Sequence, residues 1–254
     1  MEAFGLGIFM LSACVFDALL EHPSSPLHLM LDDAFLRRAL MGVVMGLTAI
    51  AIFYSPWGKR SGAHINPAVT LAFYTLGKIR SVDATGYVIA QFAGSAAGVG
   101  VAALLIGPPL AHSSVNFVVT VPMPGGELTA FLAEALISFL MVTTVLLVSN
   151  TKEISHYTPL FAGSLVALFI TFEAPLSGMS MNPARTFASA VFANDWRGGW
   201  IYFTAPFLGM TAAAQLYRFH SGLHRVFCAK LHPHHHHSAV CIFHCNYGEL
   251  HGNQ

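Results

Sequence analysis

Six long apolar stretches, separated by short polar segments, dominate the chain. They cover about residues 1–20, 38–55, 84–106, 128–148, 158–176 and 199–217. Each is close to the roughly 20 residues that a helix needs to cross a hydrocarbon layer about 30 Å thick. Inside lipid the backbone must satisfy its own hydrogen bonds, which only helices and closed barrels achieve, and the alternation typical of a membrane barrel is not seen. The pattern therefore predicts six transmembrane helices.

Two further segments, residues 61–77 and 177–193, are too short and too polar to span a membrane. Each contains an Asn followed by a Pro, at Asn66-Pro67 and Asn182-Pro183. This pair is typical of a capped helix N-terminus with proline in the first turn. About ten mainly apolar residues follow in each case. We therefore expect two half-helices that enter the membrane and end inside it.

The composition agrees with a lipid-covered surface. Of the 254 residues, 55% are hydrophobic and 9% are charged, whereas a soluble domain carries about 25% charged residues. The net charge is zero with neutral histidines, so nothing indicates a nucleic-acid partner. The four cysteines do not form a disulfide framework, because Cys14 lies in an apolar stretch and the others lie near the C-terminus. The first stretch carries Glu2 and Asp17 and no basic start, which favours a retained helix over a signal peptide.

Basic residues are distributed unequally between the loops. One side of the expected membrane carries eight of them: Lys59, Arg60, Lys78, Arg80, Lys152, Arg218, Arg225 and Lys230. The other side carries only Arg37, Arg38 and Arg197, and Asp32 and Asp33 precede the first two. Because cytoplasmic loops are enriched in Lys and Arg, we expect a multi-pass protein with both termini in the cytoplasm.

The two halves of the chain, about residues 1–110 and 127–219, resemble each other. Asn66-Pro67-Ala68 matches Asn182-Pro183-Ala184, and Glu2 in the first apolar stretch matches Glu134 in the fourth. Three spanning helices per half mean that the second half enters the membrane inverted. Inverted repeats with broken helices place a site near the midplane, where the ends of the half-helices meet.

A single Asn-Pro-Ala triplet indicates only a capped helix, but two copies in matching places are specific. The segments Ser-Gly-Ala-His-Ile-Asn-Pro-Ala-Val-Thr and Met-Asn-Pro-Ala-Arg-Thr-Phe resemble those of the aquaporins, or major intrinsic proteins, and the resemblance covers about residues 1–220. It implies an all-α membrane protein with six transmembrane helices and two re-entrant half-helices. It also implies a passive channel for water, not an enzyme, that needs no cofactor and forms homotetramers with one pore per subunit.

Elementary electrostatics agrees with this function. Each half-helix carries about half a positive charge at its N-terminus, so two such ends facing one midpoint repel cations. The side-chain amides of Asn66 and Asn182 can donate hydrogen bonds to a passing water there. An unpaired Arg185 inside a membrane costs at least about 3 kcal/mol, so we expect it to face water. The alternative is a buried ion pair with Glu173.

The resemblance assigns further roles. It implies that Arg185 forms an outer constriction, that Glu2 and Glu134 brace the half-helix loops and that His64 lines the cytoplasmic vestibule. The remaining constriction residues are Ile170, Met179 and a residue of the second helix. Alignment by pattern favours Met45, whereas strict counting favours Gly46 because of a one-residue insertion near Ser55.

This ring departs from both main branches of the family. It lacks the His and the aromatic ring of water-selective members, and also the Trp and Phe wedge of glycerol facilitators. Thr186, Ala190 and the aromatic start of the last apolar stretch, Trp200-Ile201-Tyr202-Phe203, resemble water channels. We expect a channel for water that also tolerates small neutral solutes. The alternative is a glycerol-, metalloid- or ammonia-type facilitator of low water selectivity.

Residues 221–254 differ from the rest and are expected to form a disordered cytoplasmic tail rich in His and Cys. Within it, Cys241, His244 and Cys245 offer soft ligands at short spacing, which suits zinc and similar ions. The alternative is a solvated tail that binds metal only adventitiously. Three rival functions remain: an ion-coupled transporter, a membrane enzyme and a purely adhesive protein. A transporter would carry acidic residues at the midplane, where this chain has Asn.

Overall fold

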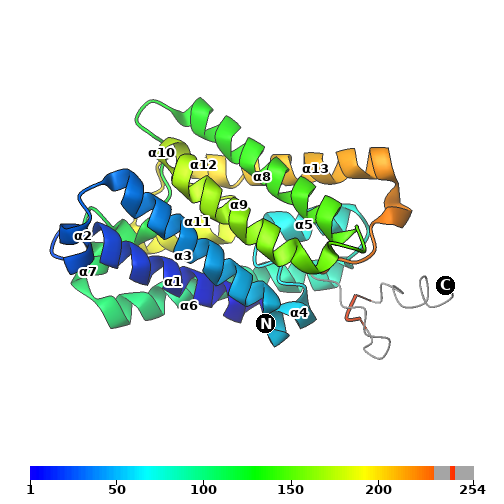
Figure 1. The fold of residues 1–254 in the computed structure, drawn as a ribbon, viewed down its shortest axis with the longest axis horizontal. Coiled ribbons are helices and arrows are strands. Elements are labelled where there is room, and N and C mark those ends of the chain that lie inside the picture. The colour runs from blue at the N-terminus through cyan, green and yellow to red at the C-terminus, as the bar shows by residue number, and fades with distance from the viewer. Residues whose placement is uncertain (232–240, 244–254) are drawn as a thin grey trace.

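The computed structural model describes residues 1–231 and 241–243, and all regular structure in this part of the chain is helical. Six long helices run side by side as one bundle (Figure 1). This confirms the expected all-α fold. The long helices are α1 (Glu2–Glu21), α3 (Ala34–Tyr54), α6 (Ser81–Ile106), α8 (Glu127–Ser149), α9 (Thr158–Phe172) and α13 (Ala205–Ser221).

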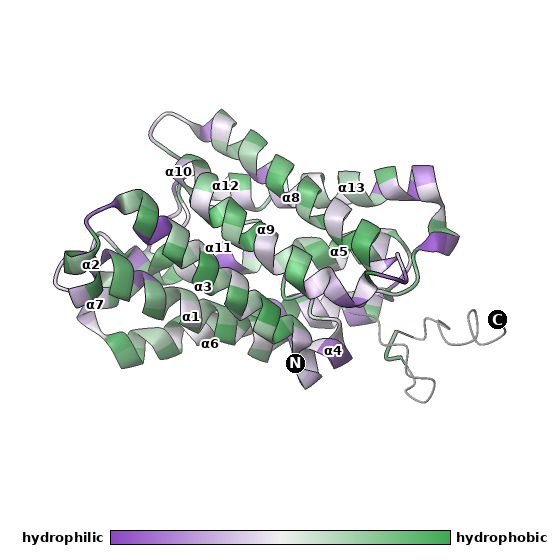
Figure 2. Cartoon of the chain, in the orientation of Figure 1, coloured by the Kyte–Doolittle hydropathy of each residue, from purple (hydrophilic) through white to green (hydrophobic). Residues whose placement is uncertain are grey.

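Hydrophobic residues cover the length of these helices, and hydrophilic residues gather at their ends (Figure 2). Five helical segments in the described part are long and apolar enough to cross a membrane: α1, α3, α6, α8 and residues 155–172, which include α9. Large apolar side chains such as Leu104, Leu128 and Leu132 are exposed on the outside of the bundle. Outward-facing leucines in such numbers indicate a lipid-facing surface, so the chain is an integral membrane protein.

The helix bounds differ from the expected ones where a local cap decides them. Helix α3 begins at Ala34, four residues before the expected start, because the Asp33 carboxylate caps it by accepting from the Leu36 N–H at 2.8 Å. Helix α9 ends at Phe172, because a separate turn, α10 (Ala174–Ser177), follows. The sixth expected span is broken into α12 (Gly199–Tyr202) and the 17-residue α13, which has a proline in its first turn.

Both expected half-helices form, as α5 (Pro67–Thr75) and α11 (Pro183–Ala193). Each begins at the proline of its Asn-Pro pair. The Asn66 side chain accepts from the Ala68 N–H at 2.8 Å, and the Asn182 side chain accepts from the Ala184 N–H at 3.1 Å. Because these caps satisfy N–H groups that no helical carbonyl can reach, they fix where each half-helix starts.

The helices pack in corresponding pairs. Helix α1 packs along α6, and α8 packs along α13, while α3 packs along α9 between the two halves. Each half-helix packs on the third long helix of the other half, α5 on α13 and α11 on α6. Short elements lie in the connections between these helices: α2 (Pro26–Met30), α4 (Pro56–Ser61), α7 (Pro108–Ala111), η1 (Asn116–Val118) and η2 (Ser155–Tyr157). A last short element, η3 (Leu223–Arg225), follows α13.

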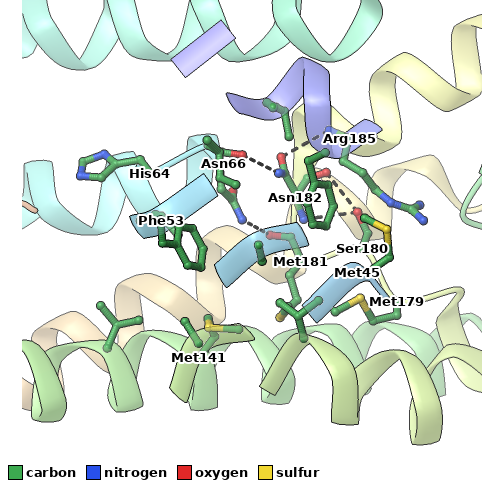
Figure 3. A pocket seen from close by; sticks show the side chains of 18 of the residues that line it. Met45, Phe53, His64, Asn66, Met141, Met179, Ser180, Met181, Asn182 and Arg185 are labelled. Carbon is green, nitrogen blue, oxygen red and sulfur yellow. Dashed lines mark hydrogen bonds between the residues drawn. The ribbon is translucent and has the colours of Figure 1, made fainter. Parts of the chain in front are cut away.

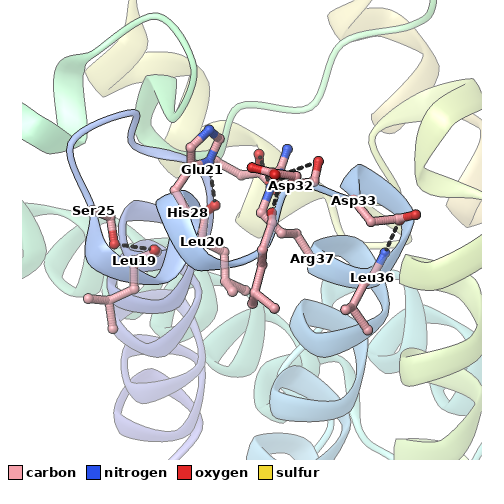
Figure 4. A network of polar contacts seen from close by, with 10 residues as sticks. Leu19, Leu20, Glu21, Ser25, His28, Asp32, Asp33, Leu36 and Arg37 are labelled. Carbon is pink, nitrogen blue, oxygen red and sulfur yellow. Dashed lines mark hydrogen bonds and ion pairs between the residues drawn. The ribbon is translucent and has the colours of Figure 1, made fainter.

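Arg37 and Arg38, which depart from the distribution of basic residues, are both engaged in local contacts. The Arg37 Nε donates to both carboxylate oxygens of Glu21 at 3.2 Å, and its Nη1 donates to the carbonyls of Leu31 and Asp32 (Figure 4). The Arg38 Nε donates to the Thr171 carbonyl at 2.8 Å. The two arginines are therefore held by an ion pair and by backbone carbonyls. Because of these local contacts, their place in the chain does not indicate which side of the membrane is cytoplasmic.

Glycines allow the close helix pairs. A Cβ on Gly94 of α6 would lie 2.1 Å from the Ala3 carbonyl oxygen of α1, and one on Gly98 would lie 2.3 Å from the Gly7 carbonyl oxygen. Likewise, a Cβ on Gly46 of α3 would lie 2.6 Å from the Gly163 carbonyl oxygen of α9. The small residues at four-residue spacing thus serve packing within the chain, because they let two backbones approach.

This packing predicts a large difference between two glycines of the same helix. We expect Gly94→Leu to lower the free energy of unfolding by about 3 kcal/mol, because overpacking a close contact forces the backbones apart. The matched control is Gly86→Leu, since a Cβ on Gly86 meets nothing within 4 Å. Thermal unfolding of the purified protein in detergent measures both. Equal melting temperatures for the two variants would contradict the close α1–α6 contact.

Candidate functional site

A cavity of about 110 Å³ lies between the N-termini of the two half-helices. One water needs about 10–15 Å³ by this measure, so the cavity has room for several. His64 lies towards one end, Arg185 lies at the other, and Asn66 and Asn182 lie between them (Figure 3). The wall is mainly apolar, with Leu6, Phe53, Met141, Val166 and Met210 among its residues.

The two asparagines are joined across the centre by reciprocal hydrogen bonds. The Asn66 Nδ2 donates to the Met181 carbonyl at 2.7 Å, and the Asn182 Nδ2 donates to the Ile65 carbonyl at 2.8 Å (Figure 3). An amide nitrogen has two N–H groups, and each Nδ2 makes one hydrogen bond among the described residues. A second N–H on each asparagine therefore remains for a guest in the cavity.

The loops that lead into the half-helices have the same unusual backbone in both halves. The residues three and one before each asparagine have positive φ: 50° at Ala63, 40° at Ile65, 50° at Met179 and 52° at Met181. A positive φ is uncommon outside glycine and costs about 1–3 kcal/mol per residue. Such a conformation persists only where the surroundings hold it in place.

Two buried carboxylates hold these loops. The Glu2 Oε2 accepts from the Ile65 N–H at 2.6 Å and from the Gln91 Nε2 at 2.9 Å, while its Oε1 accepts from the Ser61 Oγ at 2.7 Å. Because the loop backbone has no helical partners and is buried inside the bundle, the carboxylate supplies its acceptors.

The second half repeats this arrangement. The Glu134 Oε1 accepts from the Ser180 N–H at 2.6 Å and from the Ser177 Oγ at 2.8 Å, and its Oε2 accepts from the Met181 N–H at 2.7 Å. The Tyr202 hydroxyl donates to the carbonyl of Ser177. Glu134 is fully buried. The two glutamates, each from the first long helix of its half, thus have corresponding partners in the loop before each half-helix.

The four residues expected to form a ring all line the cavity: Met45, Ile170, Met179 and Arg185. Met45 and Met179 lie near Arg185 at its end of the cavity (Figure 3). The choice between Met45 and Gly46 is decided by packing. Gly46 lies against the backbone of Gly163, so the preceding residue on α3, Met45, faces the cavity (Figure 3).

Arg185 has no ionic partner among residues 1–231 and 241–243. Its Nη1 is buried without a hydrogen bond there, and so are both carboxylate oxygens of Glu173. The three ion pairs in this part of the chain are Arg37–Glu21, Arg80–Asp83 and Arg197–Asp195. The alternative of an Arg185–Glu173 ion pair is therefore not seen, and the guanidinium lies on the cavity wall.

His64 lies at the other end of the cavity, but it does not face open solvent. Its side chain is buried, with Nδ1 3.1 Å from the Thr70 Oγ1 and Nε2 2.6 Å from the Ala229 carbonyl oxygen. Its ring stacks on Phe73, with the centroids 5.1 Å apart. The expectation that His64 lines a vestibule is thus modified, because a C-terminal segment covers it.

Part of the segment that is expected to form a disordered tail from residue 221 is buried against the bundle. Val226, Cys228, Ala229 and Leu231 are buried, and Leu231 lines the cavity. Leu231 and Cys228 were not predicted as functional residues, because this segment has no helical or strand periodicity. The prediction for this segment rested mainly on its histidines.

Only one residue of the expected metal site can be placed. The Cys241 Sγ lies 3.6 Å from the Cys228 Sγ, whereas His244 and Cys245 lie outside the described residues. Within residues 1–231 and 241–243 no three potential ligands gather in one place. The cysteine that approaches Cys241 is therefore not one of the residues expected to form the metal site.

Comparison with known proteins places the chain in a family. The family model described as major intrinsic protein matches residues 2–217, and the chain belongs to this family. Aquaporin NIP1-1 of Arabidopsis thaliana is 36% identical over 183 residues, which are 70% of this chain and 60% of that one. Human Aquaporin-4 is 36% identical over 194 residues, which are 74% of this chain and 56% of that one. The matches thus span somewhat more than half the length of these relatives.

A solved structure shows the same fold. The X-ray structure of the aquaglyceroporin from Plasmodium falciparum superposes with a TM-score of 0.66 and covers 85% of this chain and 92% of that one, at 20% sequence identity. At this identity the likeness concerns the arrangement of the helices.

The buried carboxylates generate a prediction about stability. We expect Glu134→Ala to lower the free energy of unfolding by about 3 kcal/mol or more, because it leaves two backbone N–H groups without acceptors, each costing ~1–3 kcal/mol. The matched control is Glu127→Ala at the exposed start of the same helix. Thermal unfolding in detergent measures both variants. A melting temperature for Glu134→Ala that equals the control would show that the loop does not depend on this carboxylate.

Proposed function

We propose that the chain is a passive channel for water and small neutral solutes, with the cavity between α5 and α11 as its pore. The observation that carries this proposal is the placement of Asn66 and Asn182, whose amides meet at one midpoint from opposite half-helices. In this proposal the chain is a channel and not an enzyme, and it needs no cofactor. Water and small neutral solutes pass through the proposed pore, and lipid surrounds the helix bundle.

The proposed mechanism follows from the fields at the midpoint. Both half-helix N-termini face it, and each contributes about half a positive charge. A water at this point accepts from the free N–H of Asn66 and of Asn182, so its own hydrogens point away from both. Proton transfer needs a continuous chain of hydrogen bonds, which this orientation interrupts. The Arg185 guanidinium adds a full positive charge at one end, which further repels cations.

We also propose that both termini are cytoplasmic and that the chain forms homotetramers. The excess of Lys and Arg in the loops supports the first. The N-terminus lies next to α4, which carries Lys59 and Arg60, and the end of α13 points to the same end of the bundle (Figure 1). The tetramer rests on membership of the family. The pore in this proposal lies inside one chain, so conduction does not need residues of a neighbour.

Water flux tests the proposed function directly. Liposomes that contain the protein should shrink faster than empty liposomes after an osmotic step in a stopped-flow instrument. The activation energy should be close to that of water diffusion, because a pore replaces partition into lipid. The same assay on a chain that ends at Ser221 keeps all the long helices and provides a second reading. If neither chain exceeds empty liposomes while both are folded, the protein is not a water channel.

A specific observation supports passage of solutes larger than water, with glycerol, ammonia and undissociated metalloid acids as candidates. The cavity that Arg185 lines is also lined by Met45, Ile170 and Met179, which offer no hydrogen-bond donors. The two methionines are unbranched and flexible, while Arg185 offers donors on one side. This amphipathic cross-section suits a solute with hydroxyl groups on one face and carbon on the other.

The solute proposal predicts the effect of a double substitution. Ile170→His with Met179→Cys should reduce glycerol flux at least about tenfold relative to water flux, since single groups in a binding pocket discriminate by 10–200-fold. Light scattering after a glycerol gradient measures solute flux on the same liposomes. The double variant Val43→Ser with Leu47→Ser, on the exposed side of α3, is the control. A wild-type chain that conducts water but rejects glycerol, ammonia and boric acid would contradict this reading.

A further inference from the structure

The end of the cavity at His64 is covered by a segment of the chain itself, Val226–Leu231, which we call the cover segment. We propose that the cover segment is a built-in plug, which closes the pore when it is seated and must leave before water passes. This inference rests on the proposed function, since a plug is meaningful only if the cavity is a pore. It adds a regulatory contact within the chain to that function.

Three hydrogen bonds seat the cover segment on three different parts of the channel. The Leu231 N–H donates to the Gly62 carbonyl at 3.2 Å, directly before the first half-helix loop. The Ala229 carbonyl oxygen lies 2.6 Å from the His64 Nε2. The Phe227 N–H donates to the Asn150 side-chain oxygen at 2.8 Å, at the end of α8. Because these anchors come from both halves of the channel, the segment bridges the mouth.

The contact between the cover segment and His64 occupies a polar side chain that an open pore would present to water. With Nδ1 next to the Thr70 hydroxyl and Nε2 next to the Ala229 carbonyl, both ring nitrogens have partners. Water that enters from this side finds no free donor or acceptor on the ring. The cover segment thus occupies the position of the first water at this end.

Leu231 supplies the apolar part of the plug. Its side chain is 4% exposed, and it lines the same cavity as Asn66 and Asn182. A file of water needs hydrogen-bonding neighbours at each step, and a leucine side chain offers none. The adjacent Lys230 extends this closure, since its Cα would lie 3.1 Å from a Cβ placed on Gly62.

A second layer lies over the cover segment. Phe243 stacks on His64, with the centroids 6.0 Å apart and the rings at 6°, and it also contacts Tyr87 at 5.9 Å. The Cys241 sulfur lies 3.6 Å from that of Cys228, which belongs to the cover segment. Two parts of the tail therefore meet at one mouth of the cavity.

The way the cover segment is attached allows it to leave. It is not part of a helix: α13 ends at Ser221, and Gly222 has a φ of +81°, a conformation that suits a hinge. The hydrogen bonds at Phe227, Ala229 and Leu231 and the burial of small or apolar side chains are among the contacts that seat it. Val226, Ala229 and Leu231 join the hydrophobic core of the bundle, but no long helix or half-helix includes a residue of the cover segment, so its release leaves the helices that form the pore.

The experiment compares two leucines of the tail in the full chain, reconstituted into liposomes. Leu231→Asp places a charge in the apolar mouth and should expel the cover segment, raising water permeability per folded protein at least about fivefold, the lower bound typical of coupled equilibria. The matched control is Leu223→Asp, because Leu223 is 40% exposed and lies outside the cover segment. It should conduct like the wild type. Melting temperature and size exclusion confirm that both variants are folded.

Truncation gives an independent reading. A chain that ends at Ser221 should conduct like Leu231→Asp, whereas a chain that ends at Phe243 keeps the cover segment and should conduct like the wild type. If Leu231→Asp and the chain ending at Ser221 both conduct no faster than the wild type, and all exceed empty liposomes, the plug is refuted while the water channel stands. If none of the chains exceeds empty liposomes, both proposals are refuted.

Discussion

The fold depends on one constraint: backbone that is not helical lies in the middle of a membrane bundle, where lipid can offer it no hydrogen bonds. The loops before α5 and α11 need acceptors for N–H groups that no helix satisfies. Glu2 and Glu134 supply them, each from a long helix of the same half. A carboxylate has two oxygens that accept several hydrogen bonds, so one side chain can hold an entire strained turn in place.

The same constraint makes the two halves depend on each other. Asn66 donates to the carbonyl of Met181, and Asn182 donates to that of Ile65, so each loop satisfies a backbone group of the other. Each half-helix also packs on the third long helix of the opposite half. Neither half could bury its own loop alone. The cavity therefore lies at the boundary between the repeats, and its two amides face each other.

The symmetry ends at the mouths of the cavity, where the two halves carry different side chains. One mouth has Arg185 with a ring of apolar residues, which selects by charge and size. The other has His64, which corresponds in place to Ser180 and is covered by the C-terminal segment with Leu231. In the proposed channel, selection by the ring at Arg185 and closure by the C-terminal segment are thus assigned to opposite ends, and the symmetric centre orients water and repels cations.

The sequence by itself determined the helical architecture, because apolar length and helix caps are local properties. The half-helices begin where Asn66 and Asn182 predicted, and the fold class was correct. Tertiary structure decided the rest. Met45 rather than Gly46 faces the cavity because Gly46 packs against a distant backbone, a rotation that spacing cannot reveal. The position of Leu231 is set by hydrogen bonds between residues that are more than 160 positions apart in the sequence. No local pattern in that segment encodes these contacts.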